Sequence, residues 1–202
     1  MLASASPRRR EILERIGISF DVQPAHTDET PHAGEPPLAF VKRVALEKAV
    51  AVRNGVGRDE SAFVLAADTA VIVDGAILGK PADDREAQAM LARLSGRTHT
   101  VATAFAILAP GVDAPAAERT VESRVTFRRL TADEIAAYVE TGEPRGKAGA
   151  YAIQGCAAAF VERISGSYSN VVGLPLAEVV EDLAACGAID WPSDLKTKGR
   201  AS

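Results

Sequence analysis

The chain has 202 residues, of which 47% are hydrophobic and 25% charged, and its net charge is −4. This size and composition are typical of a globular protein with a real core, and the negative charge excludes a general attraction to nucleic acid or to a membrane surface. It carries two cysteines, Cys156 and Cys186, and has neither a signal-peptide pattern nor an apolar run long enough to span a membrane. We therefore expect a cytoplasmic protein in which any anion site is a local cluster of basic residues.

The first predicted helix begins at Ser6, which is typical of an N-cap, with Pro7 at the first helical position and Gly17 as the stop. Its first turn holds the arginines at positions 8–10, although the helix dipole favours carboxylates there. A bound anion would relieve this conflict, because backbone N–H groups, serine hydroxyls and guanidinium groups would converge on it. A solvated basic patch explains the same pattern, and the local sequence leaves both interpretations open.

A short strand is predicted over residues 18–22, followed by a polar loop over 23–37 and a helix over 38–53. One face of this helix carries residues at alternating spacings of three and four: Leu38, Val41, Ala45, Lys48 and Val52. Lys48 is the only charged member of that face. Its ammonium group either reaches water along the helix surface or points at something anionic.

Residues 62–80 predict a buried strand followed by a β-hairpin, because Asp74-Gly75 is a strong two-residue turn signal. The register that follows pairs Val73 with Ala76, Val71 with Leu78 and Thr69 with Lys80. Asp68 is then diagonal to Lys80 and within its reach. A simple cross-strand salt bridge would also explain this pair.

Later elements are expected as helices over 83–95, 131–140 and 176–185 and as strands over 98–108, 119–130 and 158–164. Asp83 with Glu86 and Thr131 with Glu134 are capping boxes of the first two helices. The mixed order of strands and helices predicts an α/β or α+β fold with an internal cleft. Residues 190–202 are a polar tail that we expect to fray.

The sequence shows no Ser-His-Asp spacing, nucleophile elbow, Walker A or GxGxxG motif, and its three histidines are scattered. Polar residues in unusual settings are Ser4, Ser6, Arg8, Arg9, Lys48, Lys80 and Lys147 on the basic side, Glu29 and Asp68 on the acidic side, and the neutral Thr69 and Gln154. Several cations can hold a polyphosphate, and a few carboxylates can hold Mg²⁺ or Mn²⁺. The pattern favours a phosphate-handling enzyme.

Six motifs together resemble the Maf family over nearly the whole chain: SASPRR at 4–9, AADT at 66–69, GKP at 79–81, LSGRTH at 94–99, KAGAYAIQG at 147–155 and SYSNVVGLPL at 167–176. The resemblance implies an α/β fold with a mixed curved sheet flanked by helices, in two lobes with a substrate cleft, as in Maf and ITPase-like proteins. It implies one domain over residues 1–189, with 190–202 as the tail. Family members have several apolar residues before the SxSPRR stretch, whereas only residues 1–3 precede Ser4 here, so either the strand before Ser4 is very short or the start of the sequence is misassigned.

The resemblance also implies a nucleoside triphosphate pyrophosphatase that cleaves between the α and β phosphates with a divalent metal ion. The family's proton acceptor falls on Asp68, which with Glu29 would hold the metal. Its phosphate-binding cluster falls on Ser6, Arg8, Arg9, Lys48 and Lys80. Ser4, in SASPRR, and Lys147, in KAGAYAIQG, are further candidates for substrate binding. The family's substrate-selecting positions fall on Arg8, Thr69 and Gln154. A homodimer would fit the family.

Gln154 favours one branch of the family. A glutamine amide offers one acceptor and one donor group, which complements the imide edge of thymine or uracil. A guanine edge presents adjacent donors that a carboxylate would satisfy better, as expected in the branch acting on 7-methyl-GTP. We therefore expect dTTP and UTP, normal or modified, as substrates. The alternatives are 7-methyl-GTP, and a nucleotide-binding regulator of cell division with little turnover.

Overall fold

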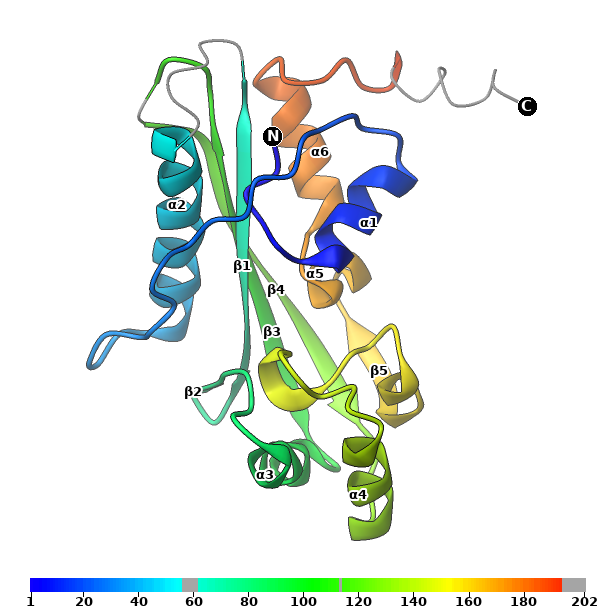
Figure 1. Cartoon of the computed structure of the whole chain (residues 1–202). Coiled ribbons are helices and arrows are strands. Elements are labelled where there is room, and N and C mark those ends of the chain that lie inside the picture. Colours follow the sequence, from blue (N-terminus) through cyan, green and yellow to red (C-terminus); the bar gives the residue numbers. More distant parts are fainter. Residues whose placement is uncertain (56–61, 113, 194–202) are drawn as a thin grey trace. The chain divides into compact units, whose positions relative to one another are not determined.

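The computed structural model describes residues 1–55, 62–112 and 114–193 (Figure 1). The chain forms two compact units. Unit 1 comprises Met1–Asp68, Ala104–Thr120 and Gly173–Ser202, and unit 2 comprises Thr69–Thr103 and Val121–Val172. The chain passes from one unit to the other within the strands β1, β3 and β4 and again at Val172–Gly173.

Five strands form one sheet in the order β2-β1-β3-β4-β5. Their bounds are β1 (Val64–Val73), β2 (Ala76–Leu78), β3 (Thr98–Leu108), β4 (Pro115–Phe127) and β5 (Val161–Ser165). The described pairings of β1 with β2 and of β4 with β5 are antiparallel. The expected α/β class is confirmed.

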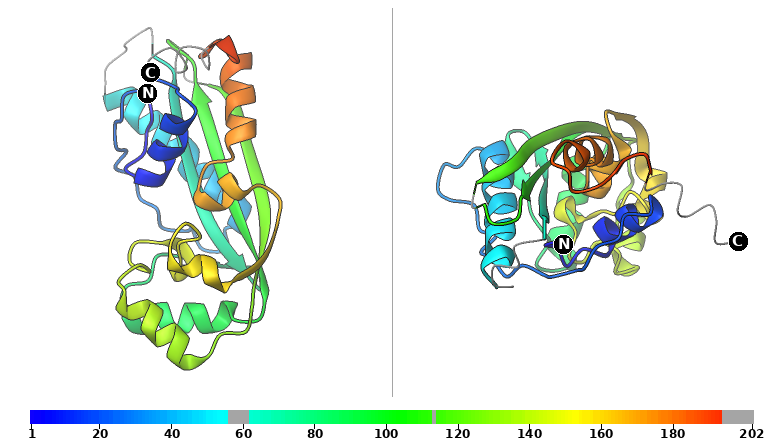
Figure 2. Two further views of the ribbon diagram at one scale, coloured as in Figure 1. Left: turned by 90° about the vertical axis from the view of Figure 1, so that its right-hand side faces the viewer. Right: turned by 90° about the horizontal axis from the view of Figure 1, so that it is seen from above.

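In unit 1, α2 (Pro37–Gly55) and α6 (Leu176–Ala185) lie on opposite sides of β1 (Figures 1 and 2). The core beneath α2 contains residues from the helix, β1, β3 and the N-terminal segment: Ala3, Ala49, Val52, Val64, Ala66, Ala106 and Leu108. Successive residues of a strand point to opposite faces of the sheet, so Leu65 points away from α2. There it lines a cavity together with Leu183 of α6. The expected apolar face of α2 is buried from Val41 onward. Leu38 is the exception, being 40% exposed in the first turn.

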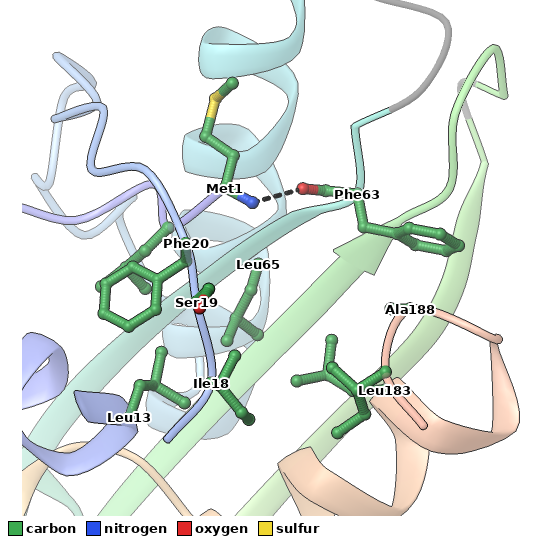
Figure 3. A pocket seen from close by; sticks show the side chains of 11 residues that line it. Met1, Leu13, Ile18, Ser19, Phe20, Phe63, Leu65, Leu183 and Ala188 are labelled. Carbon is green, nitrogen blue, oxygen red and sulfur yellow. Dashed lines mark hydrogen bonds between the residues drawn. The ribbon is translucent and has the colours of Figure 1, made fainter. Parts of the chain in front are cut away.

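The N-terminal segment makes a single parallel bridge on each side, from Leu2 to Val22 and from Leu2 to Leu65. This agrees with the very short first strand that the sequence predicts. The predicted strand over 18–22 is wrong, since only Val22 makes a bridge. Ile18 and Phe20 instead line the apolar cavity shown in Figure 3, where the Met1 nitrogen donates a 2.8 Å hydrogen bond to the Phe63 carbonyl.

In unit 2, α3 (Asp84–Leu94) packs against α4 (Ala132–Glu140) and against the 3-10 turn η1 (Ala148–Ala150). The predicted capping box of Thr131 with Glu134 is present in its reciprocal form. At Asp83 the side chain accepts from Glu86 N as predicted, but the Glu86 carboxylate accepts from Ala82 N instead of Asp83 N. The predicted strand over 158–164 begins only at Val161, because residues Cys156–Phe160 form the 3-10 turn η2. A short helix, α5 (Tyr168–Val172), completes the unit.

Within the described residues, no helix is both long and apolar enough to cross a membrane.

Candidate active site

A buried lysine joins two carboxylates in unit 1. Lys48 Nζ lies 2.7 Å from Asp68 Oδ1 and 2.6 Å from Glu29 Oε1. Both Lys48 and Asp68 are 7% exposed, whereas Glu29 lies on the exposed loop before α2. The lysine on the inward face of α2 thus points at an anion rather than at bulk water. Three of the predicted site residues meet at one ammonium group.

Arg9 is the buried arginine of α1 (Pro7–Arg15). Its Nε donates to the Gly173 carbonyl at 2.8 Å, and Nη1 donates to Ser4 Oγ at 3.2 Å. Burial lowers the pKa of Arg9, and the negative charges of Asp68 and Glu29 counteract this. Arg9 is thus a buried cation that two hydrogen bonds hold in the first turn of α1.

Ser6 occupies the N-cap of α1, as predicted, but its hydroxyl makes no capping hydrogen bond within the described part of the chain. Its backbone N–H donates instead to Ser4 Oγ at 3.2 Å. The first turn of α1 contains no acidic residue. Arg10 is exposed and pairs with Glu14 at 2.6 Å, so this arginine is a surface charge. The side chains of the helix start that can bind an anion are therefore those of Ser4, Ser6, Arg8 and Arg9.

The hairpin of unit 2 has the predicted turn and register. Val71 pairs with Leu78, and Val73 with Ala76, while Asp74 and Gly75 have φ values of 53° and 73°, as a two-residue turn requires. The strand β2 ends at Leu78, so the ladder stops before the expected pairing of Thr69 with Lys80. Just beyond Leu78, the Gly79 carbonyl accepts a 3.1 Å hydrogen bond from Gly149 N.

This Gly79–Gly149 bond links the segment of Lys80 to the segment of Lys147. Lys147 precedes η1, and its carbonyl accepts from Ala150 N at 3.0 Å. The Lys147 ammonium lies 3.4 Å from the Arg145 carbonyl. Two of the predicted phosphate-binding lysines therefore belong to backbone segments that are directly bonded to each other.

Thr69 is half-buried and belongs to a network of buried hydroxyl groups. Its Oγ1 lies 2.9 Å from Thr103 Oγ1, which donates to the Asn170 carbonyl at 3.0 Å. A carbonyl can only accept and Thr103 has one hydroxyl proton, so both contacts are hydrogen bonds only when Thr69 donates to Thr103. Toward any further partner, Thr69 Oγ1 is then an acceptor. Asn170 is itself fully buried and donates to Val101 O and Ser123 Oγ.

Gln154 lies in unit 2 on the turn between η1 and η2, and its side chain is exposed. The same turn is bound by two residues of the neighbouring segment, Tyr138 and Glu143, neither of which the sequence pattern singles out. Their role depends on contacts 13 to 14 residues away along the chain, so no local signal reveals it. Asn170 and Thr103 are likewise missed, although Asn170 lies within a recognised motif.

The family model described as Maf-like protein matches residues 1–186. The chain belongs to the Maf family. Maf proteins similar to it include three that are named dTTP/UTP pyrophosphatase. The one from Geobacter metallireducens is 52% identical over 94% of this chain and 96% of its own length. The one from Moorella thermoacetica is 52% identical over 95% and 96%, and the one from Myxococcus xanthus 53% identical over 93% and 92%.

Among solved structures, a nucleoside-triphosphatase / dITP/XTP pyrophosphatase from Mycobacterium abscessus covers 64% of this Maf chain and 74% of its own. It is 24% identical, with a TM-score of 0.38.

The two carboxylates of this Maf protein fit one mode of divalent metal binding. Among the residues described, no group of three or more His, Cys, Asp or Glu side chains is arranged to hold a metal ion. Mg²⁺, however, is commonly held by one or two carboxylates together with the phosphates of a bound nucleotide. Asp68 and Glu29 meet at the Lys48 ammonium and supply that number of carboxylates. The donor set therefore suits a metal that arrives with a triphosphate.

Proposed function

We propose that this protein hydrolyses dTTP and UTP to the nucleoside monophosphate and pyrophosphate. The names of relatives at 52–53% identity over nearly the whole chain support this activity and this choice of base. The structural observation that carries the proposal is the contact of Asp68 with the buried Lys48. A carboxylate kept in place beside a cation, on a strand lined by small buried residues, suits proton transfer next to a bound polyanion.

In the proposed mechanism, Asp68 accepts the proton of the water that attacks the α phosphorus, and pyrophosphate leaves. Lys48 stabilises the negative charge that builds on the phosphate oxygens and keeps the Asp68 carboxylate oriented. Arg9, held at two points by Gly173 and Ser4, offers a preorganised guanidinium group. We assign the other phosphate contacts to the basic and hydroxyl residues of the motifs: Ser4, Ser6, Arg8, Lys80 and Lys147.

Asp68 and Glu29 would hold a divalent cation, Mg²⁺ or Mn²⁺. When bound, the ion would neutralise charge on the triphosphate and polarise the phosphoryl group. Both carboxylates contact Lys48, so binding of the ion would compete with that ammonium for their oxygens.

We assign base selection to Gln154, Thr69 and Arg8. The amide of Gln154 can pair with a carbonyl and the N3–H of an imide edge. Thr69 offers an acceptor, because its proton is committed to Thr103. Cytosine has an acceptor in place of the N3–H, so this arrangement would disfavour CTP.

We also propose that the protein works in the cytoplasm, a reducing compartment, since Cys156 and Cys186 are both free thiols.

The test is release of pyrophosphate from dTTP, UTP, CTP and 7-methyl-GTP by the purified chain with Mn²⁺ or Mg²⁺. We expect turnover of dTTP and UTP, little of CTP, and loss of turnover on chelation of the metal. Preference for 7-methyl-GTP would place the chain in the other branch. Tight binding of dTTP or UTP with no release of pyrophosphate would instead support the regulator.

A further inference from the structure

Gln154 lies near the tip of a closed turn in unit 2. Gly155 N donates to the Ala152 carbonyl at 3.0 Å, which makes Gln154 the third residue of a hydrogen-bonded four-residue turn. Ile153 is 7% exposed and anchors the turn in the core, whereas Gln154 is exposed. The position of the Gln154 amide therefore depends on what holds the backbone of this turn.

One pair of side chains, Tyr138 and Glu143, holds both ends of the turn. On the entering side, Ala152 N donates to the Tyr138 hydroxyl at 3.2 Å. On the leaving side, Cys156 N donates to Glu143 Oε2 at 3.0 Å and Ala157 N to Oε1 at 3.4 Å. The Tyr138 hydroxyl in turn donates to Glu143 Oε1 at 2.8 Å, which joins the two ends into one network.

Gly155 lets the carboxylate come this close. A Cβ atom built on Gly155 would lie 2.3 Å from Glu143 Oε2, far inside van der Waals contact. The residue after Gln154 thus has no side chain because Glu143 occupies that space. Burial opposes ionisation of Glu143, but the hydrogen bonds from Cys156 N and from Tyr138 outweigh it and lower its pKa. The carboxylate is ionised at neutral pH and accepts all three donors.

We propose that Glu143, acting with Tyr138, is a positioning residue for nucleobase selection, which fixes the turn that presents Gln154 to the imide edge of a pyrimidine. This inference rests on the proposed function, in which Gln154 contacts the base. Glu143 touches neither the phosphates nor the base in this assignment. Its loss should therefore weaken discrimination between bases more than it slows the chemical step.

The first experiment compares E143Q with the wild type in steady-state hydrolysis of UTP and CTP. Glutamine keeps the shape of the side chain but retains one acceptor oxygen for three donors, so the turn loses part of its support. We expect KM for UTP to rise and the ratio of kcat/KM for UTP over CTP to fall, each by about tenfold, with kcat little changed. E140Q, at the exposed end of α4, is the matched control and should leave both values unchanged.

The second variant, G155A, disrupts the same contact by changing Gly155 instead of Glu143. The added methyl group must displace the Glu143 carboxylate, and φ at Gly155 is −108°, which alanine tolerates. G155A should lower the UTP to CTP ratio as E143Q does. Because the two changes break one interaction, the double variant should be no less selective than the worse single variant.

Amide hydrogen exchange supplies a readout that needs no substrate. In E143Q, the amide hydrogens of Cys156 and Ala157 should exchange about tenfold faster than in the wild type. The global unfolding free energy of both proteins is measured as a control, so that faster exchange is not mistaken for overall destabilisation. Unchanged exchange at both amides would overturn the structural part of the inference. Faster exchange with an unchanged UTP to CTP ratio in both E143Q and G155A would overturn its role in selection.

The proposed function is tested independently of the role of Glu143. It is wrong if the wild type releases no pyrophosphate from dTTP or UTP. Calorimetric binding of UTP and CTP to the wild type and E143Q then decides the inference. A fall in the affinity ratio in E143Q supports positioning by Glu143, and an unchanged ratio, or no binding of either nucleotide, rejects it.

Discussion

Lys48 Nζ lies 2.7 Å from Asp68 Oδ1, so a lysine of helix α2 and an aspartate of strand β1 form a buried ion pair. Glu29 contacts the same ammonium at 2.6 Å from a loop that is more exposed. One cation thus restrains the carboxylate that we propose as the proton acceptor. The Lys48–Asp68 ion pair leads to one prediction for activity and another for stability.

Replacing Asp68 with asparagine should abolish most turnover without unfolding the protein. The amide oxygen can still accept from Lys48, but an amide cannot take a proton from water at neutral pH. We expect kcat for UTP to fall by at least about 100-fold, in the range typical of a lost general base. Pyrophosphate release measures this, with D133N in the first turn of α4 as the control. Near-normal release by D68N would remove Asp68 from the mechanism.

Replacing Lys48 with methionine should destabilise unit 1, because it leaves the Asp68 carboxylate buried without its partner. Removal of one member of a buried ion pair costs about 3 kcal/mol of unfolding free energy. The double variant K48M/D68N should recover part of that loss, since no unpaired charge remains buried. Urea unfolding measures all three proteins. The control is K42M, whose ion pair with Glu118 is 55% exposed on the lysine side and should cost less than about 1 kcal/mol.

His99 should make the protein less stable in mild acid. The ring is 2% exposed, its Nε2 lies 2.9 Å from the Tyr151 hydroxyl, and burial lowers its pKa from 6.5 to about 4. The unfolded chain therefore binds a proton at a higher pH than the folded protein does. The stability contribution is complete above pH 6.5 and is lost as the pH falls toward 4.

Between pH 7 and pH 5 this titration should lower the unfolding free energy by about 2 kcal/mol. In H99Q, which keeps a polar group for Tyr151, that part of the pH dependence should disappear. Urea unfolding at both pH values measures the difference. The same slope in H99Q and in the wild type would assign the acid sensitivity to other groups, and H26Q at an exposed position is the control.

Thr103 should influence base selection through Thr69. In T103V the hydroxyl of Thr69 loses Thr103 as the acceptor of its proton, so it can donate toward the substrate. Such a donor matches N3 of cytosine better than the N3–H of uracil. The kcat/KM ratio for UTP over CTP should fall several-fold, about fivefold by the usual strength of one hydrogen bond. T103S keeps the hydroxyl and should retain the wild-type ratio, so equal loss in both variants would indicate a packing effect.

Much of the local structure could be predicted from the sequence. Asp74-Gly75, the caps at Asp83 and Thr131, and the inward position of Lys48 depend on interactions within a few residues, where spacing and conformational preference decide the outcome. Local patterns failed where distant segments compete for the same backbone. Residues 18–22 alternate like a strand, yet only Val22 bridges to Leu2, and η2 replaces the start of the predicted last strand.

The site divides in the same way. The motifs were enough to select Asp68 and Gln154 as candidates. Lys48 was selected by its place on the apolar face of its helix, and Glu29 by the family resemblance. The metal ion, the domain boundary at residue 189 and a homodimer stay predictions.

Only the tertiary structure placed the Lys48 ammonium between two carboxylates, and only it set the Glu143 carboxylate against Gly155. These contacts join residues that are 12 to 20 positions apart. The geometry of these contacts is set by how the helices and strands pack and by which hydrogen-bond donors need a partner. The spacing of residues along the chain determines neither of these.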